Sequence, residues 1–269
     1  MIEKYLKQLK EKGYSESAQK RYRQVLSYFK TRKFSKKSIT EYQKELTKYA
    51  MNTRINYLTS LRKYLRDQDA ELAEKIIIPK QIIEHPKDIP TQEKVKEILQ
   101  KPDITTYKGI RDKVILELIY SAGIRRQELL NLKIEDVDIQ KQILRINQGK
   151  NKKDRIIPIS GQAMQWLTKY LIKIRESWRP KTEYIFLSRQ GYQMPIVSLH
   201  KIIRRYGKYS CHKYRHAYAT HLMRNGMKVA TLQRLLGHSR IRTTQVYTQI
   251  TIKELKESHA KYHPRNKWN

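Results

Sequence analysis

The sequence predicts a mainly α fold with a small antiparallel β-sheet (α+β), built from an N-terminal helical domain and a larger C-terminal domain. Residues 1–75 carry apolar side chains at helical spacing, with short polar breaks between segments. The next stretch, IIIPKQIIEHPKDIP, has three prolines and no helical stripe, which is typical of an extended linker. Beyond it, two short β-rich runs interrupt a helical pattern. We therefore expect domains at 1–75 and 91–269, a linker at 76–90, and a C-terminal tail from about residue 250.

Four helices are expected in the N-terminal domain. MIEKYLKQLKEKG is a short amphipathic helix that Gly13 ends, and Ser15 can cap the next, SESAQKRYRQVLSYFKTRK. A third helix is expected over 38–50 and a fourth over NTRINYLTSLRKYLRD. The core-facing stripes of the second and fourth helices are Tyr22, Val25, Leu26, Phe29, Ile55, Leu58, Leu61 and Leu65. The opposite faces carry Lys and Arg, which suits either a DNA-binding surface or a solvated charged face.

The C-terminal domain should begin with a helix over TQEKVKEILQ, capped by Thr91. QILRINQGK and DRIIPIS flank a polar turn, so they predict a β-hairpin with residues 150–154 at or near the turn. EYIFLSRQG is expected to add a third strand to this sheet. Helical pieces follow over 198–206, 214–225, 229–236 and 241–247, with Gly226 and Gly237 as stops.

The charge of the chain is strongly unbalanced. It has 58 Lys and Arg against 25 Asp and Glu, a net charge of +33 at pH 7. Such an excess indicates a polyanionic partner, with nucleic acid first, and a lysine-rich genome explains only part of it. The single cysteine, Cys211, excludes an intrachain disulfide and fits a reducing, cytoplasmic setting. No apolar run approaches the length of a membrane span, so no membrane partner is expected.

Three clusters carry residues suited to chemistry. In SAGIRRQELLNLKIEDVD, Arg125 and Glu128 share a helix face; the arginine could hold a phosphate, or the two could form an ordinary surface ion pair. In QGKNKKDRIIP, a turn lysine could donate a proton to a leaving oxygen, although solvated turns are often rich in lysine.

The third cluster lies between Ser210 and Gln249, SCHKYRHAYATHLMRNGMKVATLQRLLGHSRIRTTQVYTQ. His212 and His216 have the spacing of a helical metal site, but no acidic residue accompanies them and Arg215 would repel a cation, so we expect no metal. A tyrosine that attacks a phosphodiester without a metal would need cationic and hydrogen-bonding groups to stabilise the added negative charge. The scarcity of carboxylates fits such an attack on DNA phosphate.

The chain resembles the tyrosine recombinases of the phage integrase family and is Xer-like in size. The motifs that carry the resemblance are GIRRQELLNL, GKNKKDRIIP, HKYRHAYATHL and LLGHSRIRTTQVY, in this order along the chain. The resemblance implies a catalytic set of Arg125, Lys150, His212, Arg215, His238 and the nucleophile Tyr247, with Glu128 in support. Lys150 would be the general acid, and Tyr247 would form a 3′-phosphotyrosyl link to DNA.

Several neighbours of these residues are not expected to be catalytic. Arg126 lies beside the first arginine, and Lys152 and Lys153 lie near Lys150, which the distance from Pro158 favours. His216, His221 and Tyr218 are expected to pack or support the site. Two positions depart from the family pattern: Asn151 replaces a usual glycine and Tyr214 a usual leucine, and neither change removes a catalytic group.

The resemblance implies site-specific recombination of double-stranded DNA through a Holliday junction, with no metal, ATP or other cofactor. It also implies a tetramer on two DNA sites, in which the tail docks on a neighbouring protomer, although a tail folded back on its own chain is an alternative. A partner recombinase or activator is possible, and the size favours an Xer-like or small mobile-element enzyme. Two other functions stay open: a type IB topoisomerase that relaxes DNA as a monomer, and a DNA-binding protein with an inactive site.

Overall fold

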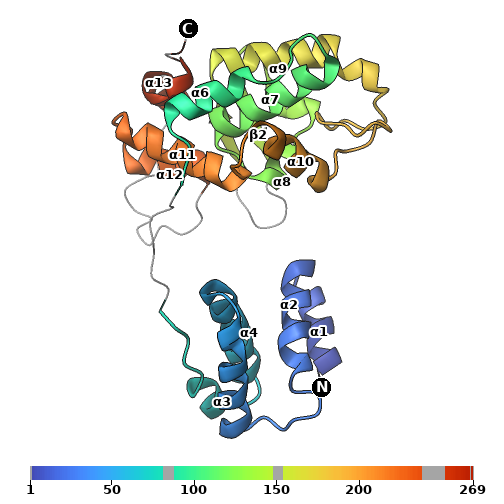
Figure 1. Ribbon diagram of the computed structural model, residues 1–269, viewed down its shortest axis with the longest axis vertical. Coiled ribbons are helices and arrows are strands. Elements are labelled where there is room, and N and C mark those ends of the chain that lie inside the picture. The colour runs from blue at the N-terminus through green and yellow to red at the C-terminus, as the bar shows by residue number, and fades with distance from the viewer. Residues whose placement is uncertain (1, 81–87, 148–153, 238–251, 267, 269) are drawn as a thin grey trace. The chain divides into compact units, whose positions relative to one another are not determined.

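The computed structural model describes residues 2–80, 88–147, 154–237, 252–266 and 268, and it divides into two compact units, 1–85 and 86–269 (Figure 1). The first unit is helical throughout. Its elements are α1 (Ile2–Glu11), α2 (Glu16–Ser27), α3 (Lys36–Glu45), the 3₁₀ turn η1 (Leu46–Lys48), α4 (Met51–Arg66) and α5 (Ala70–Glu74).

Local sequence sets the ends of these helices. Gly13 follows α1 with φ of 73°, and the Ser15 hydroxyl accepts a hydrogen bond from the Ala18 N–H at the start of α2, as expected. The third helix begins earlier than expected, because Ser35 rather than Ser38 caps it and the two serines form a reciprocal capping box.

The core of the first unit is formed by the apolar stripes expected from the sequence. The expected core residues of the second helix and the residues after it are all buried. Those of α4 are buried too, except Ile55, which is half-buried. The rings of Tyr5 and Tyr64 meet edge to face, with centroids 4.8 Å apart. Ile76 is fully buried in this core, so the first part of the proline-containing stretch belongs to the first unit.

The second unit is also mainly helical. Its elements are α6 (Gln92–Gln100), α7 (Tyr107–Ala122), α8 (Arg126–Asn131), η2 (Ile134–Asp136), β1 (Val137–Asp138), β2 (Ile143–Ile146), β3 (Arg155–Pro158), α9 (Gly161–Lys173), η3 (Arg175–Trp178), α10 (Ile196–Tyr206), α11 (Cys211–Arg224), α12 (Val229–Leu236), α13 (Ile252–Tyr262) and η4 (Pro264–Asn266). Among the described residues, no helix is long and apolar enough to cross a membrane.

Helix α7 is the centre of the second unit. Nearly every residue from Gly109 to Ala122 is buried, because α6, α8, α9, α10 and α11 all contact this helix (Figure 1). Thr91 caps α6 as expected, with its hydroxyl accepting from the Lys94 N–H at 3.2 Å.

The small sheet is antiparallel and has the order β1-β2-β3. Strands β2 and β3 form the expected hairpin, in which Ile146 pairs with Arg155 and Ile143 with Pro158. The expected third strand at 183–191 is wrong, since β1 takes that place beside β2. The 183–191 segment makes only isolated bridges, one of them between Tyr184 and Lys133, because its apolar side chains fill the core beside α9 instead of extending a ladder.

The C-terminal tail folds back on its own unit. In α13 and η4, His259 and His263 are buried and contact backbone carbonyls of α7, at Ser121 (2.9 Å) and Tyr120 (3.3 Å). Arg265 forms two hydrogen bonds to Glu117 of α7 at 2.7 and 2.8 Å. In this single chain the tail thus adopts the alternative of folding back on its own unit, and docking on a neighbouring protomer stays a prediction.

Candidate active site

The turn between α7 and α8 places Arg125 at the surface. Gly123 ends α7 in the left-handed region, with φ of 55°, and a Cβ on it would lie 2.5 Å from the Tyr218 ring. Ile124 is then buried, so Arg125 falls at the N-cap of α8 with its side chain 44% exposed. The guanidinium of Arg125 is therefore held at a helix start and open to solvent, as an anion-binding arginine would be.

Glu128 fixes this arginine from one turn further along α8. Its carboxylate accepts from the Arg125 backbone N–H at 2.8 Å and from Arg125 Nη1 at 2.7 Å. Arg155 of β3 donates to the same carboxylate through Nη1 at 3.0 Å and Nη2 at 2.8 Å. Burial by itself would raise the pKa of Glu128, but hydrogen bonds from Arg155 and Arg125 outweigh it and hold the pKa at about 2. Glu128 is therefore ionised at neutral pH.

Arg215 projects from α11 into the interior of the second unit. It is buried, and it donates to the carbonyl of Gly123 at 2.7 Å and to that of Leu236 at 2.5 Å. Burial and the nearby charge of Arg125 lower the pKa of Arg215 to about 10, so the side chain stays protonated at pH 7.

His212 lies one turn before Arg215 on the same helix. Its side chain is exposed, and its ring meets that of His216 edge to face, with centroids 4.3 Å apart. Partial burial, followed by the charges of Arg215 and Arg125, lowers the pKa of His212 below its usual 6.5. A neutral imidazole at pH 7 can accept one proton and donate another.

The three arginines meet at the carboxyl end of α12. Arg155 Nε donates to the carbonyl of Leu235 at 3.0 Å, Arg215 to that of Leu236, and Arg125 Nη2 to that of Gly237 at 3.3 Å. The last carbonyls of a helix have no partner within it and carry partial negative charge, so cations are favoured there. The three guanidinium groups carry three positive charges, and Glu128, which pairs with Arg125 and Arg155, offsets one of them. The cluster is therefore cationic and suited to an anionic ligand such as a phosphate.

Comparisons with known proteins identify the family of the chain. A profile for the phage integrase family matches residues 89–254. The chain belongs to the phage integrase family. Within this family it is 35% identical over 263 residues to tyrosine recombinase XerA of Pyrococcus horikoshii, covering 94% of this chain and 83% of that protein.

Other members of the phage integrase family match over a shorter region. Tyrosine recombinase XerC of Chlamydia pneumoniae is 37% identical over 190 residues, which is 66% of this chain and 61% of the relative. The chain thus aligns with less than two thirds of that protein's length.

Solved structures share the fold. A crystal structure of XerA recombinase covers 98% of both chains, with a TM-score of 0.52 and 24% identity. The Tn1549 transposon integrase, in complex with transposon right-end DNA, covers 96% of this chain and 98% of its own, with a TM-score of 0.68 and 18% identity.

Four of the seven residues expected at the site lie in the described part of the chain. Arg125 caps α8, Glu128 lies within it, and His212 and Arg215 lie on α11. The charge of Arg125 lowers the pKa of both His212 and Arg215, and that of Glu128 acts on Arg215 in the opposite direction. The other three lie outside the described residues. They are Lys150 in the segment joining β2 to β3, and His238 and Tyr247 in the segment that follows Gly237.

The neighbouring residues have other partners. Arg126 faces His200, with Nη1 and Nε2 3.3 Å apart. His221 is buried, and its Nδ1 lies 2.9 Å from the hydroxyl of Tyr120. Tyr218 is buried behind the Gly123 turn and packs against the tail histidines.

Sequence reasoning missed Arg155. The residue stands within GKNKKDRIIP, a motif singled out for its lysine, and no spacing rule links it to Glu128. One signal was present: it is the only arginine in a run of lysines, and bidentate binding to a carboxylate favours Arg over Lys.

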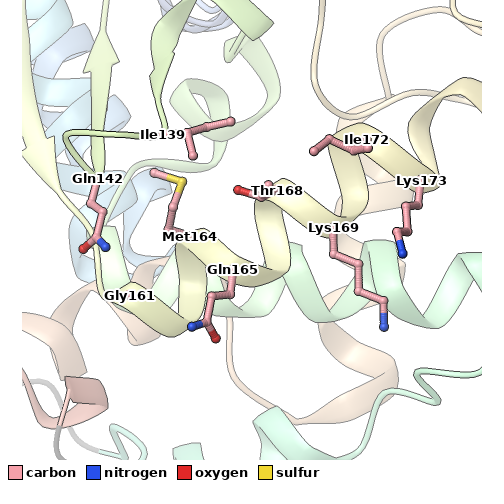
Figure 2. A pocket seen from close by; sticks show the side chains of 9 residues that line it. All are labelled: Ile139, Gln142, Gly161, Met164, Gln165, Thr168, Lys169, Ile172 and Lys173. Atoms are coloured by element: carbon pink, nitrogen blue, oxygen red, sulfur yellow. The ribbon is translucent and has the colours of Figure 1, made fainter.

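An open groove of about 510 Å³ lies elsewhere on the second unit (Figure 2). Ile139, in the turn after β1, faces Met164 and Thr168 of α9 across it. The described residues that line the groove include no member of the arginine cluster. We therefore assign the candidate site to the cluster and not to this groove.

Proposed function

We propose that this chain is a site-specific DNA recombinase that breaks and rejoins strands through a covalent tyrosine intermediate. The observation that carries the proposal is the arginine cluster at the end of α12, directly before the segment with His238 and Tyr247. Arg125, Arg155 and Arg215 each donate to one of the last carbonyls there, and Glu128 pairs with the first two. Membership of the phage integrase family supports the same activity.

In the proposed reaction the Tyr247 oxygen attacks a DNA phosphorus atom, the tyrosine proton passes to the neutral imidazole of His212, and the bond to the 5′ oxygen breaks. Lys150 gives a proton to the departing oxygen, which leaves a 5′ hydroxyl and a 3′-phosphotyrosine. Arg125 and Arg215 stabilise the charge on the phosphoryl oxygens, with His212 and His238 as hydrogen-bonding groups. A 5′ hydroxyl from a partner strand then attacks the phosphotyrosine and returns a proton to Lys150, and the tyrosine leaves with the proton held by His212. The bond energy is conserved, so no step consumes ATP.

The proposed partner is a double-stranded recombination site. A structure of XerH recombinase bound to its difH substrate and the Tn1549 integrase complex are DNA-bound relatives in fold, which supports this partner. In this proposal the helical first unit binds the core of the site and the second unit cleaves it in the cytoplasm. Self-association to a tetramer on two sites rests on the family resemblance, since the tail contacts described above lie within one chain.

Covalent capture from the native cell tests this function. The lysate is denatured, the protein is recovered, and DNA that stays attached is sequenced, with Tyr247→Phe as the control. We expect adducts at one short sequence motif from the intact chain and none from the variant. Adducts without sequence preference would contradict site specificity and indicate a topoisomerase. Adducts that persist in Tyr247→Phe would rule out this nucleophile.

A further inference from the structure

Arg155 makes three side-chain hydrogen bonds beside the candidate site, yet the family resemblance assigns it no role. It begins β3, and its side chain is only 8% exposed. Its guanidinium makes the paired contact to Glu128 and also donates to the carbonyl of Leu235. One side chain therefore ties three segments together: the start of β3, the first turn of α8 and the end of α12.

The contact to Glu128 links Arg155 to a residue of the proposed phosphate site. Each carboxylate oxygen of Glu128 accepts once from Arg155 and once from Arg125. Loss of Arg155 would leave half of these acceptor positions empty, and the carboxylate would be free to rotate. Because Glu128 sets the rotamer of Arg125, that rotation would move a guanidinium away from where the phosphate binds.

The contact at α12 links Arg155 to the segment that carries the nucleophile. Gly237 ends α12 with φ of 64°, and a Cβ on it would lie 2.8 Å from Cδ of Arg155. The arginine therefore occupies the space beside a residue that must be glycine. His238 follows directly in sequence, and Lys150 precedes Arg155 by five positions.

We propose that Arg155 is a positioning residue for strand cleavage. It holds Glu128, and through Glu128 also Arg125, at a fixed position relative to the end of α12. The guanidinium of Arg155 is bound by Glu128 and by the Leu235 carbonyl, whereas the side chain of Arg125 is 44% exposed and open to a ligand. This role rests on the proposed recombinase function and deepens it. The bidentate geometry requires arginine, because a lysine carries its donors on one nitrogen and cannot place them at the three positions that Nε, Nη1 and Nη2 occupy.

The test compares Arg155→Lys with Arg145→Lys in the full chain. Arg145 is an exposed arginine on β2 of the same hairpin, so it controls for the chemical change at a position outside the cluster. The probe is a nicked duplex that carries the sequence captured with the intact chain, and the readout is the rate of covalent adduct formation at saturating DNA. Circular dichroism gives the folded fraction, to which each rate is normalised.

We expect Arg155→Lys to form adduct about 10²-fold more slowly per folded molecule, a typical effect of displacing a site by an ångström, with duplex affinity within about threefold. Arg145→Lys should keep the rate of the intact chain. A normal rate per folded molecule in Arg155→Lys would mean that Arg155 only stabilises the fold, and would overturn the proposal. An intact chain that forms no adduct would instead refute the recombinase function, and the positioning role with it.

Gly237→Ala tests the same contact from the other side and leaves the charge of Arg155 intact. The added methyl group should displace Arg155 and slow adduct formation. In an Arg155→Ala background the same change should slow the reaction by a smaller factor, because the clashing side chain is gone. If Gly237→Ala slows the reaction by the same factor in the intact chain and in the Arg155→Ala background, Gly237 acts without Arg155. That result would count against the proposal.

Discussion

At the scale of single residues, His212 shows how the arginine cluster sets the chemistry of its neighbours. Its imidazole is partly buried and lies near two permanent positive charges, those of Arg215 and Arg125. Both effects disfavour a third positive charge, so the pKa of His212 falls below 6.5. The ring is neutral at pH 7 and can accept the proton of an attacking hydroxyl, which a protonated ring could not do.

We therefore expect the rate of adduct formation to fall at acid pH with a midpoint below pH 6.5. The sign follows from the direction of the shift: a lowered pKa keeps the reactive neutral form present at pH values where a free histidine would already be half protonated. The rate is measured at saturating DNA from pH 5 to 8. His212→Gln should lower the rate by about 10²-fold or more and remove the acid limb. If the rate of His212→Gln still falls at low pH, the titration of another group causes that fall.

The residues of the site differ in how far the sequence could predict them. Arg125, Glu128, His212 and Arg215 stand in motifs with fixed local spacing, so resemblance places them by number. Arg155 was missed because its partners, Glu128 and Leu235, are far away in sequence. Only the packing of β3 against the ends of α8 and α12 brings them together, and no local pattern encodes that packing.

At the scale of elements, the tail is the part of the fold whose position depends most on buried charge. Glu117 of α7 is fully buried, and it is paired with Arg265 at 2.7 Å and with Lys113 at 3.1 Å. Trp268 stacks on Tyr120 with the ring planes 12° apart. Polar and aromatic contacts thus anchor the tail in cis, and a buried carboxylate of α7 depends on it.

Arg265→Ala should remove about 3 kcal/mol from the free energy of unfolding of the second unit, because it leaves Glu117 buried with Lys113 as its remaining ion-pair partner. All three tryptophans lie in 86–269, so tryptophan fluorescence during urea unfolding reports this unit alone. Lys253→Ala, on the exposed side of α13, should change stability by less than about 0.5 kcal/mol. A loss below about 1 kcal/mol in Arg265→Ala would show that the pair contributes little to the unit.

The helices and the hairpin were predictable because capping residues and apolar spacing are local signals. Ser15, Thr91 and Gly13 act where the sequence placed them. The third strand was predicted wrongly because the run at 183–191 is apolar enough for a strand but is used as core packing. Strand β1 has two residues, which is too short to show the alternation of apolar and polar residues that predicts a strand.

At the scale of the whole molecule, positive charge is spread over both units. Of the 58 Lys and Arg in the chain, 20 lie in residues 1–85 against 10 of the 25 Asp and Glu, which leaves 38 against 15 for residues 86–269. Each unit therefore has its own surplus of positive charge. If both contact one duplex, as proposed, the number of neutralised phosphates should exceed what one small domain provides.

This division of charge predicts a steep salt dependence for binding to duplex DNA. If the two units together contact at least about six phosphates, the affinity for a random-sequence duplex should fall by about 10³-fold or more between 50 and 200 mM salt, because each contact releases condensed counterions. Fluorescence anisotropy of a labelled duplex at several salt concentrations gives the slope of log K against log salt, expected near −5 or steeper. Tyr247→Phe should give the same slope, because the tyrosine contributes no charge to binding. A slope near −2 would mean that only a small part of the positive charge meets the DNA backbone, and would contradict a duplex held by both units.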